Sequence, residues 1–175
     1  IDDRHVLTCK HVVSDFATGS SDHWKVKKNL TCTINFQAEG NGTQNSYALA
    51  RNVRIHLTAD LAVVEFATAP GQQPPARLAL APASVDLIAD DPLVVIGHPA
   101  ETFDATKKLS TASLIKKYNT SITYNTIVRK GSSGSPVLNS AFQVAGIHSG
   151  TKTVDGSLSA WGSHHLVIHN FLKIL

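Results

Sequence analysis

Short runs of β-branched and aromatic residues, separated by turn residues, fill almost the whole of this 175-residue chain. Such runs predict strands, because branched side chains pack well on a pleated surface. Glu39–Thr43 contains Asn-Gly and is expected to form a hairpin tip. Many short strands at regular spacing indicate an all-β fold, either a barrel or a sandwich. The expected strands are His5–Thr8, Trp24–Val26, Leu30–Gln37, Ser46–Arg54, Leu61–Phe66, Leu93–Gly97, Lys108–Lys116, Ser121–Val128, Val137–Leu138, Val144–His148 and Leu158–Gly162.

A cluster of Pro and Gly at Pro70–Pro75 lies near the middle of the chain and predicts a linker. The two halves have similar strand content, so we expect two small antiparallel β-barrels, over residues 1–69 and 86–175, joined by residues 70–85. Near the end, apolar residues follow a helical spacing, which predicts a C-terminal helix packed on the second barrel. The residues that carry this spacing are Leu166, Ile168, Phe171, Leu172 and Leu175.

The composition argues against several classes of function. The formal net charge is only +3, and the basic cluster Lys25, Lys27 and Lys28 fits a solvated strand face, so no direct nucleic-acid binding is expected. No apolar run approaches the roughly 20 residues that cross a bilayer, so no membrane contact is expected. His165 and His169 have a spacing that could hold a metal ion, but a third ligand is missing nearby. We therefore expect no metal and no cofactor.

Two features bear on the cellular compartment. The chain has two cysteines, Cys9 and Cys32, whereas secreted proteins of this kind usually carry several disulfides. This favours an intracellular location, although one bridge remains an alternative. Sequons at Asn29, Asn41 and Asn119 favour secretion instead, but a chain rich in Ser and Thr acquires some by chance. We give the cysteines more weight and keep secretion as the alternative.

The segment Gly131-Ser-Ser-Gly-Ser-Pro136 is the most specific motif in the sequence. Small residues on both sides of Ser133 allow a tight turn that exposes one hydroxyl. The amides of Gly131 and Ser133 would then form an oxyanion hole for a tetrahedral intermediate. An ordinary Ser/Gly loop has the same composition, so the motif needs partners elsewhere in the chain.

Two further segments supply these partners. His11 follows an apolar strand and Asp60 precedes another. A serine hydroxyl needs a base to take its proton, and the base needs an anion that fixes its tautomer. Each residue alone has a structural explanation, but the three together, 49 and 73 positions apart, predict a catalytic triad.

These motifs resemble those of the trypsin-like serine peptidases, which carry His, Asp and Ser in this order on two Greek-key barrels of the chymotrypsin type. The histidine motif is matched by Leu7–His11, the aspartate motif by Asp60–Val64 and the serine motif by Gly131–Pro136. The resemblance implies a serine endopeptidase that cleaves protein or peptide substrates through an acyl-enzyme intermediate.

A more extensive resemblance is to the vertebrate FAM-one-eleven nuclear serine proteases. It implies a nuclear protease that removes proteins trapped on DNA. More distantly, Ser135 before Pro136 is similar to glutamyl endopeptidases, and Val144–Ser149 is similar to the high-temperature-requirement proteases. The segments that match the nuclear group are Leu7–Val12, Ile96–Pro99, Ile122–Thr126 and Gly131–Val137.

The chain departs from the activated, secreted trypsins at two positions. Ser132 stands where they place an aspartate that binds a newly formed N-terminal amine, and Val12 stands where they place a disulfide cysteine. Both departures favour an intracellular enzyme without that activation switch. Because Ile1 lies only ten residues before His11, we expect the first barrel to lack its first strand and to have an open edge.

The same resemblance assigns residues around the substrate. Ser149 would support Asp60, and the backbone of Ser149, Gly150 and Thr151 would pair with the substrate as an added strand. His148 would point toward the specificity pocket, as in enzymes that recognise Glu or Gln, or it would be a buried structural histidine. Val128 would contribute an apolar pocket wall, which favours Phe or Tyr before the scissile bond.

Three functions therefore compete on the sequence alone. The presence of all three triad residues favours an active serine endopeptidase. The alternatives are a protease-like binding module that no longer catalyses the reaction, and a secreted, glycosylated digestive or defence protease.

Overall fold

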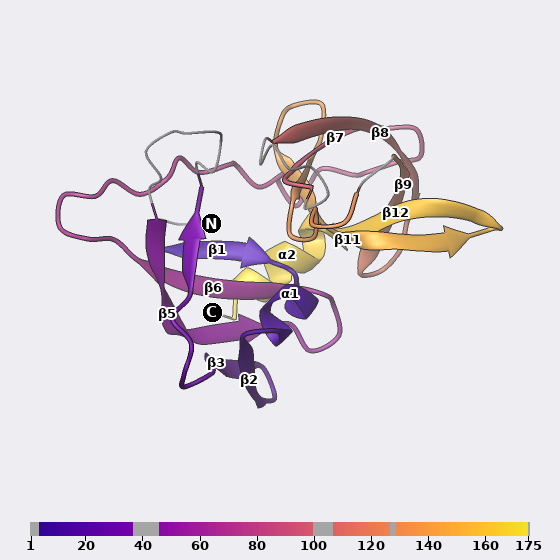
Figure 1. Cartoon of the computed structure of the whole chain (residues 1–175). Coiled ribbons are helices and arrows are strands. Elements are labelled where there is room, and N and C mark those ends of the chain that lie inside the picture. The colour runs from indigo at the N-terminus through magenta and orange to yellow at the C-terminus, as the bar shows by residue number, and fades with distance from the viewer. Residues whose placement is uncertain (1–3, 37–45, 100–106, 127–128, 175) are drawn as a thin grey trace.

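The computed structural model describes residues 4–36, 46–99, 107–126 and 129–174. Within these ranges the chain forms an antiparallel sheet, a closed β-barrel and a C-terminal helix (Figure 1). The predicted all-β fold of the chymotrypsin type, with a C-terminal helix, is confirmed. The predicted hairpin tip at Glu39–Thr43 lies outside the described residues.

The first half of the chain forms a six-stranded sheet in the order β1-β6-β5-β3-β2, with β4 paired to β5. In the described part of the chain this sheet has free edges at β1 and β2. The sequence had predicted a barrel with an open edge for this half of the chain. A short helix, α1 (Lys10–Ser14), follows β1 directly. The strands are β1 (His5–Thr8), β2 (Ala17–Ser20), β3 (His23–Val26), β4 (Thr33–Asn35), β5 (Ser46–Ile55) and β6 (Ala62–Ala67).

The second half forms a closed barrel in the order β10-β11-β12-β9-β8-β7. The last strand, β12, returns to pair with β9, which gives the Greek-key connection. The long β11–β12 hairpin extends away from the barrel (Figure 1). The strands are β7 (Pro92–Gly97), β8 (Lys108–Lys117), β9 (Ser121–Asn125), β10 (Pro136–Leu138), β11 (Val144–Val154) and β12 (Ser157–His164).

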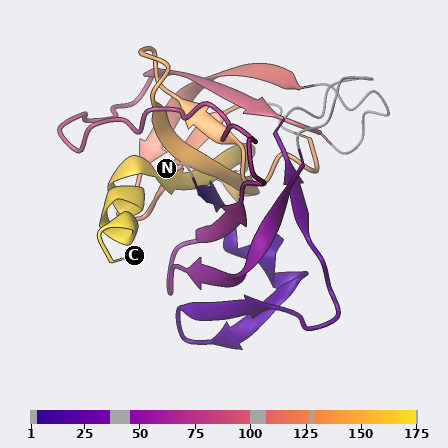
Figure 2. The same ribbon diagram turned by 90° about the vertical axis from the view of Figure 1, so that its left-hand side faces the viewer.

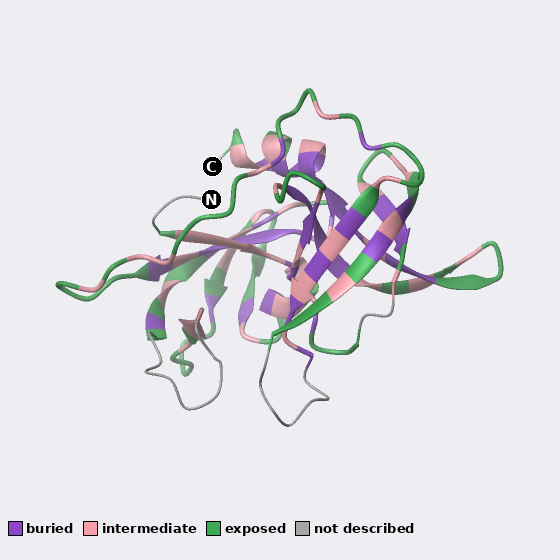
Figure 3. Cartoon of the chain, turned by 90° about the horizontal axis from the view of Figure 1, so that it is seen from above, coloured by how far each residue is buried: buried purple, intermediate pink, exposed green. Residues whose placement is uncertain are grey.

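Three apolar clusters hold these units together. One fills the barrel and includes Leu93, Leu114 and Tyr124, and Figure 3 shows the alternation of buried and exposed residues that period-2 strands produce. Another fills the sheet around Val53. The third joins the halves, because it combines Cys9, Ala59, Leu61 and Val63 of the first half with Leu138, Val144 and Ile147 of the barrel and Val167, Ile168 and Phe171 of the C-terminal helix.

The C-terminal helix, α2 (His165–Leu172), lies beside the junction of sheet and barrel (Figure 2). The residues of α2 that are buried are His165, Val167, Ile168 and Phe171, whereas the predicted Leu166 and Leu172 are only half-buried. His165 Nε2 donates to the Val85 carbonyl at 3.0 Å, and His169 Nε2 to the Ala81 carbonyl at 2.8 Å. The two histidines that sequence analysis considered as metal ligands thus fasten α2 to the connection between the halves.

The structure adds elements that the sequence pattern did not indicate. The residues of α1 and β2 were not expected to form a helix and a strand, and β11 continues six residues beyond the predicted end at His148. Both cysteines are free thiols, Cys9 buried and Cys32 half-buried. Neither helix of the described residues has the length and apolar character needed to span a membrane.

Candidate active site

His11 and Asp60 come together where α1 faces the loop before β6. The Nδ1 of His11 lies 2.7 Å from Asp60 Oδ2, and the His11 backbone N–H donates to Oδ1 at 3.0 Å. Asp60 is thus bound at both carboxylate oxygens by a single residue, which restricts how either side chain can turn. Because an ionised carboxylate only accepts hydrogen bonds, Nδ1 carries a proton and donates to Asp60, which leaves Nε2 as the candidate base.

The charge of Asp60 is stabilised by these contacts. Burial by itself would raise the pKa of this carboxyl group, because it disfavours the charged form. The backbone N–H, the ring and the charge of His11, together with the Ser149 hydroxyl, act in the opposite direction and outweigh it. The pKa of Asp60 is therefore below its ordinary value, and the group is an anion at neutral pH. This fits the role that the resemblance gave to Ser149.

Ser133 sits in a tight turn, as the glycines around it predicted. Gly131 has φ of +92° and Gly134 has φ of +88°, a region that favours glycine. The Gly134 amide donates to the His148 carbonyl and the His148 amide to the Ser135 carbonyl, both at 2.9 Å, so the turn is fastened to β11. In the described part of the chain the amides of Gly131 and Ser133 donate to no acceptor. An oxyanion hole requires two such donors without an acceptor.

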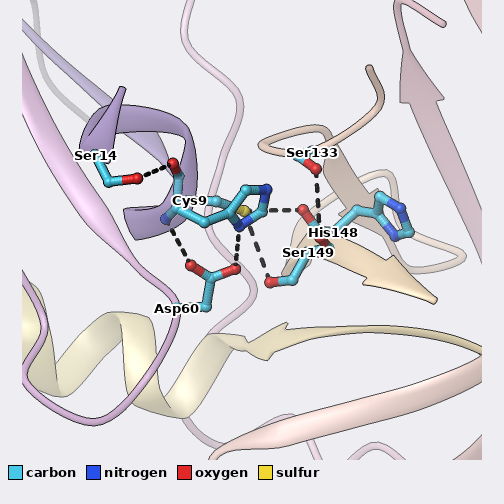
Figure 4. A network of polar contacts seen from close by, with 7 residues as sticks. Cys9, Ser14, Asp60, Ser133, His148 and Ser149 are labelled. Atoms are coloured by element: carbon cyan, nitrogen blue, oxygen red, sulfur yellow. Dashed lines mark hydrogen bonds and ion pairs between the residues drawn. The ribbon is translucent and has the colours of Figure 1, made fainter. Parts of the chain in front are cut away.

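The Ser133 hydroxyl points to the backbone of the neighbouring strand. Its Oγ donates to the Ser149 carbonyl at 3.3 Å (Figure 4). Among the described residues no hydrogen bond joins it to the His11 ring. The structure thus brings His11 and Asp60 into contact and leaves Ser133 bonded to β11. Catalytic hydrogen bonds are often long or misaligned in the absence of substrate, and a rotation about one side-chain bond redirects a serine hydroxyl.

Cys9 completes this polar network, and sequence analysis gave it no role in the site. Its Sγ donates to the His148 carbonyl at 3.1 Å and lies 3.6 Å from Ser149 Oγ (Figure 4). Burial, and next the charge of Asp60, raise the pKa of the thiol to about 12. A thiol that stays protonated is a poor nucleophile and a poor metal ligand. The partners of Cys9 lie 139 and 140 positions away along the chain, so sequence spacing gave no indication of these contacts.

Cys9, His11 and Asp60 are also the one group of three potential metal ligands among the described residues, with ligand atoms within 4.8 Å of one another. The proton on Cys9 and the proton between His11 and Asp60 occupy the positions that a metal would require. The donor set therefore fits hydrogen bonding better than metal binding.

His148 is buried and is paired with Tyr124, a partner that the sequence did not predict for it. The His148 Nδ1 lies 2.6 Å from the Tyr124 hydroxyl, and the two side chains are 2% and 0% exposed. Burial, and next the charge of His11, lower the pKa of His148 to about 4, and burial raises the pKa of Tyr124. Both groups are neutral at pH 7, so His148 carries no charge that could attract a carboxylate.

This pairing predicts an acid-sensitive fold. The unfolded chain binds a proton on His148 near pH 6.5, whereas the folded chain binds it near pH 4. The contribution of neutral His148 to the free energy of unfolding is therefore fully present above pH 6.5. It is lost as the pH decreases from 6.5 toward 4. Between pH 7.5 and 4.5 we expect His148 to account for a loss of roughly 2–3 kcal/mol in the free energy of unfolding.

Urea unfolding of the native chain and of His148→Gln at both pH values measures this loss. The variant should lose less stability than the native chain by that amount, while the exposed control His23→Gln should behave like the native chain. Equal losses in His148→Gln and the native chain would show that His148 does not titrate in this way.

The other predicted substrate residues lie along β11. Ser149, Gly150 and Thr151 follow His148 in that strand and pair with β12. Val128 lies outside the described residues. Next to Gly131 and Ser133 a cavity of about 530 Å³ opens, with an apolar wall that includes Val6, Val12 and Ile96. The turn that holds Ser133 is therefore accessible from a cavity large enough for side chains.

A closed Greek-key barrel joined to a second antiparallel sheet, with these side chains at the junction, is the architecture of chymotrypsin-like serine peptidases. Comparison with protein families agrees, because the family model for the trypsin-like peptidase domain matches residues 1–147. The chain belongs to the trypsin-like peptidase family. No curated protein matches it.

Proposed function

We propose that this chain is an active serine endopeptidase with His11, Asp60 and Ser133 as its triad. The observation that carries the proposal is the pair of hydrogen bonds from His11 to Asp60, at 2.7 and 3.0 Å, next to a glycine-flanked serine turn. These contacts use the Nδ1 of His11 and leave its Nε2 as the nitrogen that can serve as the base. A binding module without activity would not need that arrangement, so we do not favour this alternative.

The reaction follows the steps that such a pair allows. The substrate adds an extended strand to Ser149–Thr151, and a substrate N–H takes the Ser149 carbonyl that now accepts from Ser133. The released hydroxyl turns to His11 Nε2, which removes its proton as Oγ attacks the peptide carbonyl. The amides of Gly131 and Ser133 hold the oxyanion. His11 then donates its proton to the leaving amine, and water hydrolyses the acyl-enzyme by the same steps.

The finer assignment follows the resemblance to the FAM-one-eleven group. We propose a nuclear protease that acts on proteins trapped on DNA, with secretion as the alternative location. For the residue before the scissile bond we propose Phe or Tyr. The neutral, buried His148 supports an uncharged side chain at this position, because it offers a hydrogen bond but no positive charge.

Labelling with a fluorophosphonate tests the proposed mechanism, because this reagent reacts only with a serine activated by a base. We expect stoichiometric labelling of the native chain at Ser133, localised by peptide mass spectrometry. Ser133→Ala should lose the label completely, and the neighbouring control Ser140→Ala, which lies on an exposed turn, should retain it. A native chain that folds but takes no label would overturn the proposal.

A further inference from the structure

A small hollow lies beside Asp60, and none of its lining residues belongs to the serine turn. It has a volume of about 220 Å³ and is lined by the loop before β6, the β8–β9 turn and the β11–β12 hairpin. Its lining includes the hydroxyl-bearing residues Thr58, Thr120 and Ser121, with Lys152 and Trp161 from the hairpin. The hollow is thus lined by hydrogen-bond donors and by one cationic side chain.

Lys152 is held in place by aromatic rings. Its Nζ lies 4.9 Å from the centre of the Tyr118 ring and 5.5 Å from that of the Trp161 ring. Lys116 approaches the same tyrosine at 5.3 Å. Neither ammonium group has a carboxylate partner in the described part of the chain, whereas the neighbouring Lys117 is paired with Asp86. Two positioned ammonium groups that have no carboxylate partner among the described residues attract an anion.

The strand register places this hollow next to the proposed path of the substrate. Gly150 is paired with Trp161 across the β11–β12 hairpin. Paired residues face the same side of a sheet, so the Trp161 indole lies on the face where a side chain of residue 150 would stand. A Cβ at residue 150 would lie 3.6 Å from Trp161 Nε1. Because Gly150 has no side chain, the indole remains open toward a strand added along Ser149–Thr151. Lys152 lies two positions after Gly150 in β11, so the two residues face the same side of the strand.

The negative charge of Asp60 restricts where an anion can bind in the hollow. Asp60 is one of the lining residues, and both of its oxygens accept hydrogen bonds from His11. A second carboxylate would be repelled by Asp60 and attracted by Lys152, which lines the same hollow together with Thr120 and Ser121. A Glu or Asp side chain on a substrate strand along β11 would supply such a carboxylate.

We propose that Lys152 is a specificity-determining residue that binds an acidic side chain of the substrate, located on the amino-terminal side of the scissile bond. Trp161 and Tyr118 position the ammonium group, and the absence of a side chain at Gly150 gives access to it. The substrate class is therefore a peptide with Glu or Asp a few residues before the cleaved bond. This inference rests on the proposed function for its use in cleavage, but peptide binding can be measured without catalysis.

The test uses Ser133→Ala, which binds without cleaving, and fluorescein-labelled hexapeptide mixtures. One position is fixed as Glu or as its neutral isostere Gln, and the others are equimolar mixtures. Fluorescence anisotropy gives Kd for each pair. At one position we expect Glu to bind about 10-fold more tightly than Gln at low salt, because a charge-assisted contact replaces a neutral one. The preference should weaken markedly at 0.5 M NaCl.

Variants in the same background assign the preference to Lys152. Lys152→Met keeps the apolar stem on the rings and should bind Glu and Gln mixtures equally, whereas Lys152→Arg should keep the preference. Lys28→Met, an exposed lysine of the first half, is the matched control and should change nothing. Equal binding of Glu and Gln by the native site, a preference unaffected by salt, or its persistence in Lys152→Met would overturn the proposal.

Fluorophosphonate labelling keeps the two proposals separate. Labelling of Ser133 without any Glu preference would overturn the role of Lys152 alone. A Glu preference in a chain that takes no label would overturn the proposed catalysis alone and leave an acid-selective peptide site.

Discussion

Asp60→Asn is expected to lower kcat for peptide hydrolysis by about 10⁴-fold while the fold remains intact. The carboxylate accepts from both the backbone N–H and the Nδ1–H of His11. An amide in its place presents an NH₂ group to Nδ1, which favours the tautomer with the proton on Nε2. That nitrogen can then no longer take the proton of Ser133, and the reaction loses its base. The measurement is kcat on a peptide substrate at pH 7.5.

Asp22→Asn is a matched control, because Asp22 also lies beside a histidine, at 3.6 Å from His23, but belongs to the β2–β3 turn and not to the proposed site. Its kcat should stay within about twofold of the native value. Thermal melting of both variants separates loss of chemistry from loss of fold. If Asp60→Asn keeps a tenth or more of the native kcat, the proposed role of Asp60 is wrong.

Phe171→Ala is expected to reduce the free energy of unfolding by about 3–5 kcal/mol, the usual cost of removing a fully buried phenylalanine. Phe171 is 1% exposed and belongs to the apolar cluster that joins sheet, barrel and α2. Its ring also meets that of His56 edge to face, with centroids 5.4 Å apart. Removing the ring leaves a cavity in this cluster. Because both halves and α2 pack in the cluster, the cavity weakens the contact between the halves and the packing of α2. Urea denaturation at pH 7.5 measures the loss.

Phe142→Ala provides the comparison, since Phe142 is 66% exposed and removing its ring leaves no internal cavity. Its unfolding free energy should change by less than about 0.5 kcal/mol. A loss below 1 kcal/mol for Phe171→Ala would mean that α2 contributes little to the contact between the halves. A loss of similar size in both variants would point to a general effect of removing aromatic rings.

Predictions from the sequence were most accurate where the determining interactions are local. The strand His5–Thr8 matches β1 at both ends, and the strands around Leu93 and Lys108 match β7 and β8 to within one residue. The glycines at 131 and 134 indicated a turn, and both adopt positive φ. Alternating side chains and turn chemistry act over a few neighbouring residues, so they are visible in a linear pattern.

The interactions beneath and beside the site were not visible in this way. Tyr124 bonds to His148 across 24 positions, and Cys9 to the His148 carbonyl across 139. In the sequence, Tyr124 was part of the segment Ile122–Thr126 that resembles the nuclear proteases, and no sequence feature pointed to Lys152. The short helix α1 was also missed, because five residues carry too little periodicity to be recognised.

The amino-acid sequence by itself determined the strand content, the turn around Ser133 and the order of the three proposed triad residues, since each depends on near neighbours along the chain. Only the tertiary structure decided that Asp60 accepts hydrogen bonds from both the backbone N–H and the ring of His11, and that the buried His148 is paired with Tyr124. It also decided that Lys152 lines a hollow and has no carboxylate partner among the described residues. Burial and charge pairing depend on which distant segments the fold brings together, and strand register sets these distances.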